Sequence, residues 1–379
     1  MPEYYEQYGI MVVVITIAFI LKLFFFRTDV RKNSPLLMKV LFNMALPGVI
    51  FRNLYSTKKL DMDSLYLFIA GFLFQLSAGL LSILVFWFVK DKTVRKLSVF
   101  NSFALNTALF IFPVMKAVSS DGISKCIMFC ISNDVCCYAI LRPLYAVLGF
   151  EQNGLDNANQ SQEKKAVMMH ETVDEEGADE EHNEIRETIT DKSPLVESEQ
   201  NEDEEEPVTV TKPPKGVQAK LILKQTLKAI FTCVPLYAVV LGYICGLSGI
   251  EIPKFILDCV NVCADANTLL SYAVLGLFFE WKFPLTYLWP SLRVILYRIV
   301  YGLIYGLIIY FAFDGIIGDV ARFVILLSAL TPPPLVDTIY TVEYKISPAD
   351  LPIMINNFGI LSSYIVTLIV TIIIDPHFE

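Results

Sequence analysis

Long apolar runs separated by short polar segments dominate the chain. Each run is close to the roughly twenty residues that an α-helix needs to cross a bilayer. The ten predicted spans lie at residues 6–26, 35–54, 65–89, 97–117, 123–149, 221–247, 253–281, 290–312, 317–340 and 351–374. The segment before the first run is acidic and aromatic, so we expect a retained helix and not a cleaved signal peptide. The pattern predicts an all-α integral membrane protein.

A polar segment at 151–216 separates the first five spans from the last five. It holds 20 acidic and 6 basic residues and almost no aromatic ones, which leaves too little apolar surface to fold alone. We expect a first five-helix block at 1–150, an acidic disordered linker, and a second five-helix block at 217–379. The linker is either a solvated tether or a regulatory tail for a cytosolic kinase or trafficking partner, with Ser193-Pro194 as a phosphorylation site.

The composition supports this division. Only 18% of the residues are charged and 55% are hydrophobic, whereas an ordinary soluble domain is roughly 25% charged. The formal net charge of −9 comes from the linker, because the rest of the chain carries 24 basic residues against 19 acidic ones. We therefore expect a slightly cationic membrane body whose partners are the lipid bilayer and a small anion, with no nucleic acid.

Basic residues orient the predicted spans. They cluster at 27–32 after the first span and at 90–96 after the third, and loops rich in Lys and Arg remain cytoplasmic. The linker is then cytoplasmic, and both termini are extracellular or lumenal. The membrane is either the plasma membrane or that of the endoplasmic reticulum.

Prolines interrupt the fourth and ninth predicted spans. Pro113 lies in the fourth, and three successive prolines at 332–334 prevent a continuous helix in the ninth. Pro47 lies 66 residues before Pro113, and Asn267 lies 65 residues before Pro332. Because each half has an odd number of helices, this match predicts two inverted five-helix repeats in which helices 4 and 9 are broken and cross. Helix N-termini that meet in a shared cavity favour an anion, typically a carboxylate.

Polar residues inside the spans are the candidate site, since such residues are costly in a membrane. We expect substrate binding by residues near the two breaks, namely Asn43, Pro47, Asn106, Pro113, Asn133, Thr331, Pro332 and Pro333. Candidates for an ion or proton site are Lys39, Asp134 and Asp265.

Other interpretations of these residues remain open. Lys39, Asn43 and Pro47 are four residues apart and would share one helix face, but Lys39 also lies near a span end where it can snorkel. The two asparagines can also bridge helices. Arg298 is either functional or a structural partner for a carbonyl or acidic group.

Motifs of enzymes and metal sites are missing from the sequence. There is no phosphate loop or nucleophile elbow, and no histidine accompanies the cysteine pairs Cys126/Cys130 and Cys259/Cys263 in the apolar runs. We expect the cysteines to be small buried hydrophobic residues, and we expect no enzyme activity, no metal and no cofactor.

Several segments together resemble the auxin efflux carrier family, which includes plant PIN-FORMED and PIN-like carriers and bacterial organic-acid permeases. The similar segments are NMALPGVIF at 43–51, NTALFIFP at 106–113, IPKFILDCVNVCADANTLLSYAVLGLFFEW at 252–281 and SALTPPPLV at 328–336. The resemblance covers both helical blocks and places the linker at the family's variable cytoplasmic loop.

This resemblance implies ten helices in two inverted repeats, with a scaffold domain and a transport domain that moves like an elevator. Asn106 and Pro113 would form the substrate-binding break of helix 4, and Pro332 would form the crossover of helix 9. Members carry organic anions and are often homodimers. Ala108, Ile111 and the pair Asn267-Thr268 replace glycines and a proline of the family, so the identity of the substrate does not carry over.

Three functions fit the sequence. The first is efflux or redistribution of an auxin-like or other small carboxylate by elevator-type alternating access. The second is a membrane sensor that has a carrier fold and signals through the acidic linker. The third is a cation-coupled organic-anion symporter.

Overall fold

The computed structural model is all-helical over the part of the chain that it describes. It describes residues 3–26, 36–57, 59, 61–119, 121–152, 227, 231–280 and 284–374, and no strand occurs among them. The predicted disordered linker and Ser193-Pro194 lie outside these residues. Seven helices in the described part are long and apolar enough to cross a membrane, and Val234–Ser248 is a shorter apolar helix.

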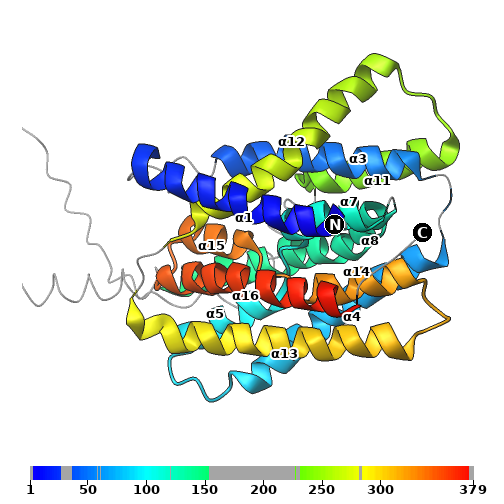
Figure 1. Cartoon of the computed structure of the whole chain (residues 1–379). Helices are drawn as coiled ribbons and strands as arrows, with labels where there is room; N and C mark the ends of the chain where they lie inside the picture. The colour runs from blue at the N-terminus through cyan, green and yellow to red at the C-terminus, as the bar shows by residue number, and fades with distance from the viewer. Residues whose placement is uncertain are drawn as a thin grey trace, which may run out of the picture.

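Long helices, shorter helices and a few short helical turns follow one another along the chain (Figure 1). The elements, with η marking π- or 3-10-helical turns, are α1 Glu3–Leu21, η1 Lys22–Phe26, η2 Leu41–Ala45, α3 Leu46–Ser56, α4 Met62–Val85, α5 Lys92–Phe103, α6 Thr107–Phe110, α7 Phe112–Val118, α8 Gly122–Val135, η3 Cys136–Leu141, α11 Val234–Ser248, α12 Lys254–Phe278, η4 Leu285–Tyr287, α13 Leu288–Ala312, α14 Asp319–Ala329, α15 Leu335–Glu343 and α16 Asp350–Ile374.

Both spans that contain the predicted breaks are interrupted. The ninth is unwound at 330–334 between α14 and α15, where the triple proline removes successive N–H donors. The fourth is unwound at 104–106, before α6, and not at Pro113. A second, shorter interruption at Ile111 separates α6 from α7, and Pro113 lies in the first turn of α7, where a helix needs no donor from it.

Two further prolines follow π-helical turns. The turn η2 ends just before Pro47, and η3 ends two residues before Pro143. A proline ring would clash with the carbonyl four residues earlier in a regular helix, and a wider turn relieves this clash. The wide turn also rotates the chain, so Pro47 is buried while Lys39 and Asn43 are exposed. The expected shared face of these three residues was therefore wrong for Pro47.

The helices pack as two groups. The flanking group, α1, α3, α11 and α12, forms the upper layer in Figure 1, and the crossing group, α4–α8 and α13–α16, lies below it. Each half of the chain contributes to both groups, so the halves are not separate packing units. The groups meet where α1 contacts α7, α12 contacts α6 and α3 contacts α8.

Ion pairs reinforce each group separately. In the described part of the chain, every ion pair joins residues of one group. The flanking group has Lys22–Glu280 and Arg52–Asp265, and the crossing group has Lys96–Glu151, Lys125–Asp61, Lys125–Asp63, Arg142–Glu343, Arg322–Asp314 and Arg322–Asp319. Polar contacts between the groups are neutral, as in the 3.2 Å hydrogen bond between the Tyr8 and Thr371 hydroxyls.

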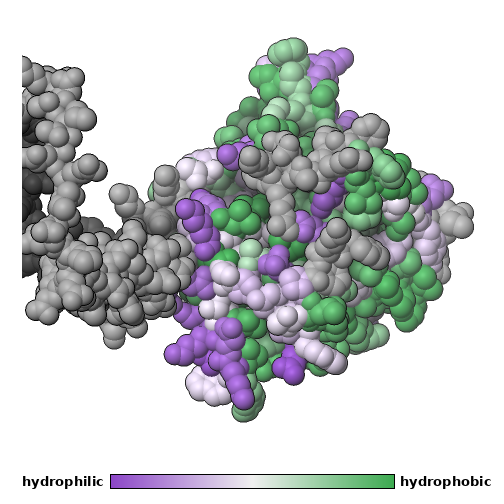
Figure 2. Space-filling view, turned by 90° about the vertical axis from the view of Figure 1, so that its left-hand side faces the viewer, coloured by the Kyte–Doolittle hydropathy of each residue, from purple (hydrophilic) through white to green (hydrophobic). Residues whose placement is uncertain are grey.

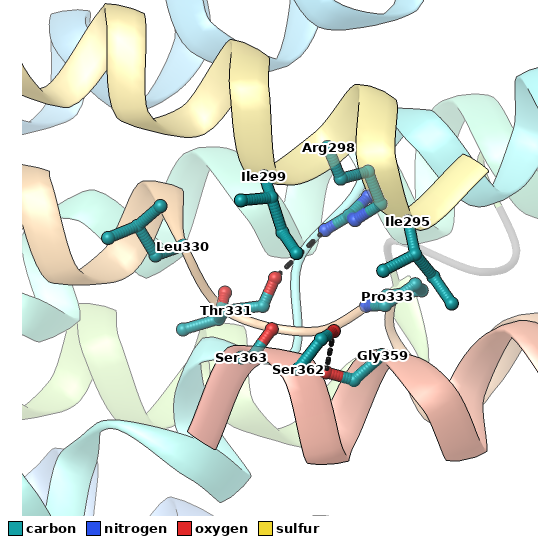
Figure 3. A pocket seen from close by; sticks show the side chains of 9 residues that line it. All are labelled: Ile295, Arg298, Ile299, Leu330, Thr331, Pro333, Gly359, Ser362 and Ser363. Carbon is teal, nitrogen blue, oxygen red and sulfur yellow. Dashed lines mark hydrogen bonds between the residues drawn. The ribbon is translucent and has the colours of Figure 1, made fainter. Parts of the chain in front are cut away.

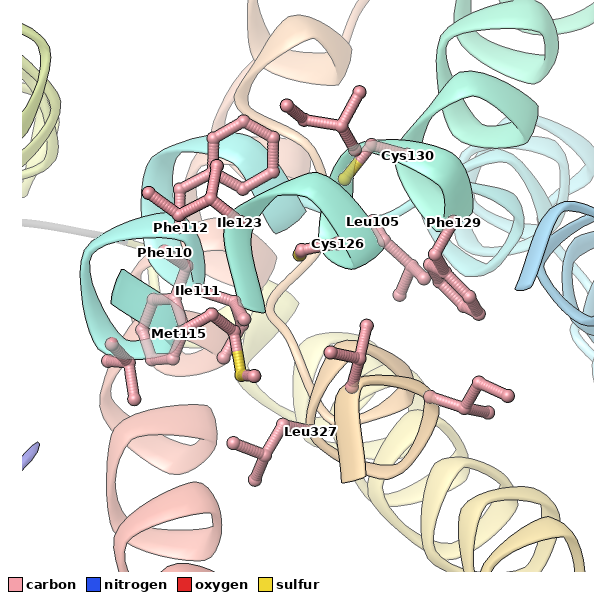
Figure 4. Close-up of a cluster of buried hydrophobic side chains, with 14 of the residues drawn as sticks. Leu105, Phe110, Ile111, Phe112, Met115, Ile123, Cys126, Phe129, Cys130 and Leu327 are labelled. Carbon is pink, nitrogen blue, oxygen red and sulfur yellow. The ribbon is translucent and has the colours of Figure 1, made fainter. Parts of the chain in front are cut away.

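The apolar core of the crossing group surrounds the broken helices. Figure 4 shows side chains of α6 and α7, such as Phe110 and Met115, against Phe129 of α8 and Leu327 of α14. All four are fully buried, and inside a membrane such side chains stabilise the fold through close van der Waals packing. This core fixes the broken segments relative to the continuous helices.

The cysteines do not all belong to this core. Cys126 and Cys130 are buried as expected, but Cys259 on α12 is exposed. The prediction of burial was wrong for Cys259 because α12 presents one face away from the protein.

The outer surface suits a bilayer. Large apolar side chains are exposed along α4, α13 and α16, among them Leu80, Leu84, Ile308, Phe311 and Ile373. Figure 2 shows the left-hand side of the molecule in Figure 1, where hydrophilic residues gather at the left and lower part of the face and apolar residues lie above them and to their right. This distribution is typical of a membrane protein seen along the bilayer normal.

Glycine permits the closest approach between α13 and α14. A Cβ atom at Gly302 would lie 2.3 Å from the carbonyl oxygen of Ala329, the last residue of α14. No ordinary side chain fits at that distance, so Gly302 sets the spacing between α13 and the ninth-span break.

We expect Gly302→Ala to destabilise the protein by about 1–3 kcal/mol, because the added methyl group must push α13 away from α14. Gly9→Ala is the matched control, since nothing lies within 4 Å of a Cβ atom there. Thermal unfolding of both purified variants in detergent measures the effect. Equal melting temperatures for the two variants would show that this contact is not tight.

Candidate functional site

The two unwound segments contact each other through the backbone. The Asn106 N–H donates a 2.8 Å hydrogen bond to the Pro332 carbonyl oxygen. All residues of both segments are buried, and a buried peptide group without a partner costs several kcal/mol in an apolar environment. This bond therefore ties the fourth-span break to the ninth-span break at the point where each has lost its helical partners. The contact between residues 104–106 and 330–334 is called the crossing below.

Asn133 of α8 completes the fourth-span break. Its side-chain oxygen accepts a 2.7 Å hydrogen bond from the Leu105 N–H, and its side-chain nitrogen donates a 2.9 Å bond to the Leu105 carbonyl oxygen. The amide thus replaces both helical hydrogen bonds of Leu105. Because both ends of the amide are engaged, Asn133 holds the unwound backbone in this conformation.

Arg298 of α13 joins the ends of both interrupted helices. Its guanidinium donates a 2.8 Å hydrogen bond to the carbonyl of Asn101, in the last turn of α5, and a 3.2 Å bond to the carbonyl of Thr331, just after α14. Figure 3 shows the side chain reaching from α13 to Thr331. Carbonyls at helix C-termini carry partial negative charge and lack helical partners. One buried cation therefore satisfies two helix ends at once.

A small space adjoins Arg298. It measures about 10 Å³ and lies among α13, Pro333 and α16, which is close to the smallest volume that holds one water molecule. It is too small for any organic ligand.

The larger cavity lies beside the crossing, between the two helix groups. It measures about 250 Å³ and is lined by η2, η3, the start of α11 and α15. Its polar side chains include Lys39, Asn43, Arg142 and Glu343. Arg142 is paired with Glu343 at 3.0 Å, whereas Lys39 has no ion-pair partner among the described residues. The lining therefore carries a net positive charge.

The π-helical turns shape this cavity. Phe42 and Asn43 belong to η2, and Tyr138 belongs to η3. A π-helical turn widens the helix locally and turns side chains away from the regular helical face. The same turns that accommodate Pro47 and Pro143 therefore direct these residues into the cavity.

The structure brings some of the expected site residues together. Asn106, Thr331, Pro332, Pro333 and Asn133 meet at the crossing, and Lys39 and Asn43 line the cavity. The Asn106 side-chain nitrogen is buried and has no hydrogen-bond partner. Asp134 lies beside the cavity residues Tyr138 and Cys233.

Other expected residues lie elsewhere. Asp265 pairs with Arg52 at 2.7 Å and its side chain is 66% exposed, so it is not part of the crossing. Pro47 and Pro113 are buried in the first turns of α3 and α7. The cavity is not lined by either proline.

Sequence reasoning gave two residues too little weight. Arg298 links the breaks, and a lone arginine within an apolar span already signalled a special role. Arg142 lines the cavity, and the nearby Pro143 was the signal for the turn that exposes it. The pairing of Asn133 with Leu105 left no sequence signal, because it depends on how α8 packs against the break.

Comparison with known proteins identifies the family of the chain. None of the curated proteins matches the chain. The family model described as membrane transport protein matches residues 7–374, which is nearly the whole chain. The protein thus belongs to the membrane transport protein family, which is the family of the auxin efflux carriers.

Proposed function

We propose that the protein carries a small organic anion, such as an auxin-like or other carboxylate, across a membrane. The observation that carries this proposal is the cavity of about 250 Å³ with its net positive lining. Ligand sites for drug-sized molecules are usually about 300–1,000 Å³, so this cavity suits a smaller molecule. Family membership supports a non-enzymatic carrier that acts on a small substrate.

Lys39 and Arg142 are the cations for the carboxylate in this proposal. Both line the cavity, where a charge-assisted hydrogen bond is stronger than in water because the surroundings are apolar. Asn43 supplies an amide donor in the same wall. Asn106 lies deeper, at the crossing, and its unpartnered side-chain nitrogen is a donor for a substrate that moves inward.

The proposed motion is of elevator type. The crossing group moves against the flanking group, which acts as the scaffold. Separate ion pairs within each group and neutral contacts between them support rigid-body motion. In this proposal the described helices belong to ten spans in two inverted repeats, 1–150 and 217–379, that are joined by the linker 151–216.

The proposed orientation puts the linker in the cytoplasm and both termini outside or in the lumen. Clusters of Lys and Arg at 27–32, shortly before the cavity residue Lys39, and at 90–96 support this orientation. This distribution follows the positive-inside rule. The cavity then faces the cytoplasm, from which an exporter would load its substrate.

We expect Lys39→Gln to weaken binding of a carboxylate by about 10- to 100-fold, since a hydrogen bond to a charged group contributes roughly 1.5–3 kcal/mol. Titration calorimetry of purified protein with indole-3-acetate, benzoate and succinate measures the affinity. Lys254→Gln is the control, because Lys254 is exposed at the start of α12 and is not part of the cavity lining. Unchanged affinity in Lys39→Gln for every acid that binds would contradict the assignment.

Two asparagines at the crossing should behave differently when replaced by alanine. Asn133→Ala should lower the free energy of unfolding by about 1–3 kcal/mol, because it leaves the Leu105 peptide groups without partners. Asn106→Ala should leave stability nearly unchanged and reduce carboxylate uptake into proteoliposomes severalfold, because its side-chain nitrogen bonds nothing in this structure. Normal uptake by Asn106→Ala would remove Asn106 from the site.

A further inference from the structure

Asp337 is a buried carboxyl group that the proposed anion site does not use. It lies in the first turn of α15, its relative exposure is 1%, and neither of its oxygens meets hydrogen-bond geometry with a partner. An ionised carboxylate in such a place exchanges its hydration for little more than the Tyr145 hydroxyl, which disfavours the charged form. A neutral carboxylic acid avoids most of this desolvation cost.

The groups around Asp337 come from several elements. Arg298 of α13 and the Tyr145 hydroxyl face the carboxyl group, and Tyr340 of α15 and Cys137 of η3 are its other titratable neighbours. Arg298 is the one cation that faces it in the described part of the chain. On α5, Asn101 contributes a neutral amide, whose nitrogen donates a 3.2 Å hydrogen bond to the Tyr145 hydroxyl.

Arg298 does not bond the Asp337 carboxyl group directly. Two of its nitrogens are occupied by the carbonyls of Asn101 and Thr331, and its Nε atom has no partner. The negative charge of an ionised Asp337 would therefore be balanced by the Arg298 guanidinium without a direct hydrogen bond between the two groups. If Asp337 became ionised, attraction would draw the guanidinium towards it and away from the carbonyls at the crossing.

A proton fits this place better than a metal cation. The guanidinium of Arg298 repels a second cation nearby, and neither cavity beside the crossing is lined by Asp337. A protonated carboxyl group also supplies an O–H donor, and the buried Asn101 side-chain oxygen lacks a donor within the same cluster.

The large cavity lies close to Asp337 along α15. Val336 and Tyr340 flank Asp337 along the helix and line the large cavity. The Tyr340 ring also packs against the Tyr145 ring at 5.7 Å between centroids. Asp337 is thus within one helical turn of the space that would admit water and substrate.

We propose that Asp337 is an exchangeable proton site whose state determines the partners of Arg298. With the proton bound, Asp337 is neutral and Arg298 holds the carbonyls of α5 and of the ninth-span break, as in this structure. When Asp337 releases H⁺ through the cavity, its carboxylate recruits the guanidinium and loosens the crossing. Coupling of this switch to anion movement rests on the proposed function, whereas proton binding itself does not.

Infrared difference spectroscopy of the purified protein in lipid tests proton binding directly. A carboxylic-acid C=O band should disappear as the pH is raised from acidic to mildly alkaline, and it should be missing in Asp337→Asn. Asp258→Asn is the matched control, because Asp258 is exposed on α12 and its replacement should leave the band intact. Should Asp337→Asn fail to fold, ¹³C labelling of aspartate in the unaltered protein must shift the band, and Asp337→Glu must remove that labelled component.

Two spectroscopic results overturn the proposal: no band that depends on Asp337, or a band that persists at every pH and so marks a fixed acid.

Flux in proteoliposomes tests the coupling. A pH gradient should accelerate uptake by the unaltered protein severalfold, and Asp337→Asn should keep exchange without a gradient but lose the acceleration. If the band titrates but the rate of uptake does not depend on the pH gradient, coupling alone is refuted. If the band titrates and no carboxylate is taken up, the proposed function is refuted, while the assignment of the proton site is unaffected.

Discussion

Unwound backbone inside an apolar body must find hydrogen-bond partners, and the rest of this structure depends on how that requirement is met. The fourth- and ninth-span breaks satisfy each other through the bond from Asn106 to Pro332, while Asn133 and Arg298 supply the remaining partners. A missing partner at any of these places would cost about as much as a large core substitution. The breaks are therefore fixed features of the fold, and α15, which follows the ninth-span break, lines the large cavity.

The same requirement ties the helices of the crossing group together. Its partners come from α8 and α13, so the continuous helices of this group are tied to the broken ones. The flanking group contributes apolar contacts and neutral hydrogen bonds at its boundary with this unit. Between the two groups lies the cationic cavity. Among the described residues this boundary has no ion pair, which supports the proposed rigid-body motion.

Much of this architecture was predictable from the sequence. Hydropathy located the long helices, and the triple proline located the ninth-span break. Of the two residues expected at the fourth-span break, Asn106 lies in the unwound segment, whereas Pro113 begins a helix instead of ending one. Proline alone does not distinguish these cases, since the outcome depends on whether a neighbour such as Asn133 can satisfy the preceding peptide groups. Asn106 and Lys39 were candidates from the sequence and stay predictions, whereas the cavity position of Arg142 and the burial of Asp337 needed the three-dimensional arrangement of η3 and α15.

In the proposed mechanism, the crossing group moves as a rigid body against the flanking group when it carries its substrate. Double electron–electron resonance tests this with spin labels at Asp258 and Ile316, one in each group, after the exposed Cys259 is replaced by serine. A second pair, Trp87 and Ile316, lies within the crossing group. Rigid-body motion should change the distance between the labels at Asp258 and Ile316 by about 5 Å or more when a carboxylate binds. The distance between the labels at Trp87 and Ile316 should stay the same. A constant distance between Asp258 and Ile316 with saturating substrate, or a change within the crossing group instead, would contradict this motion.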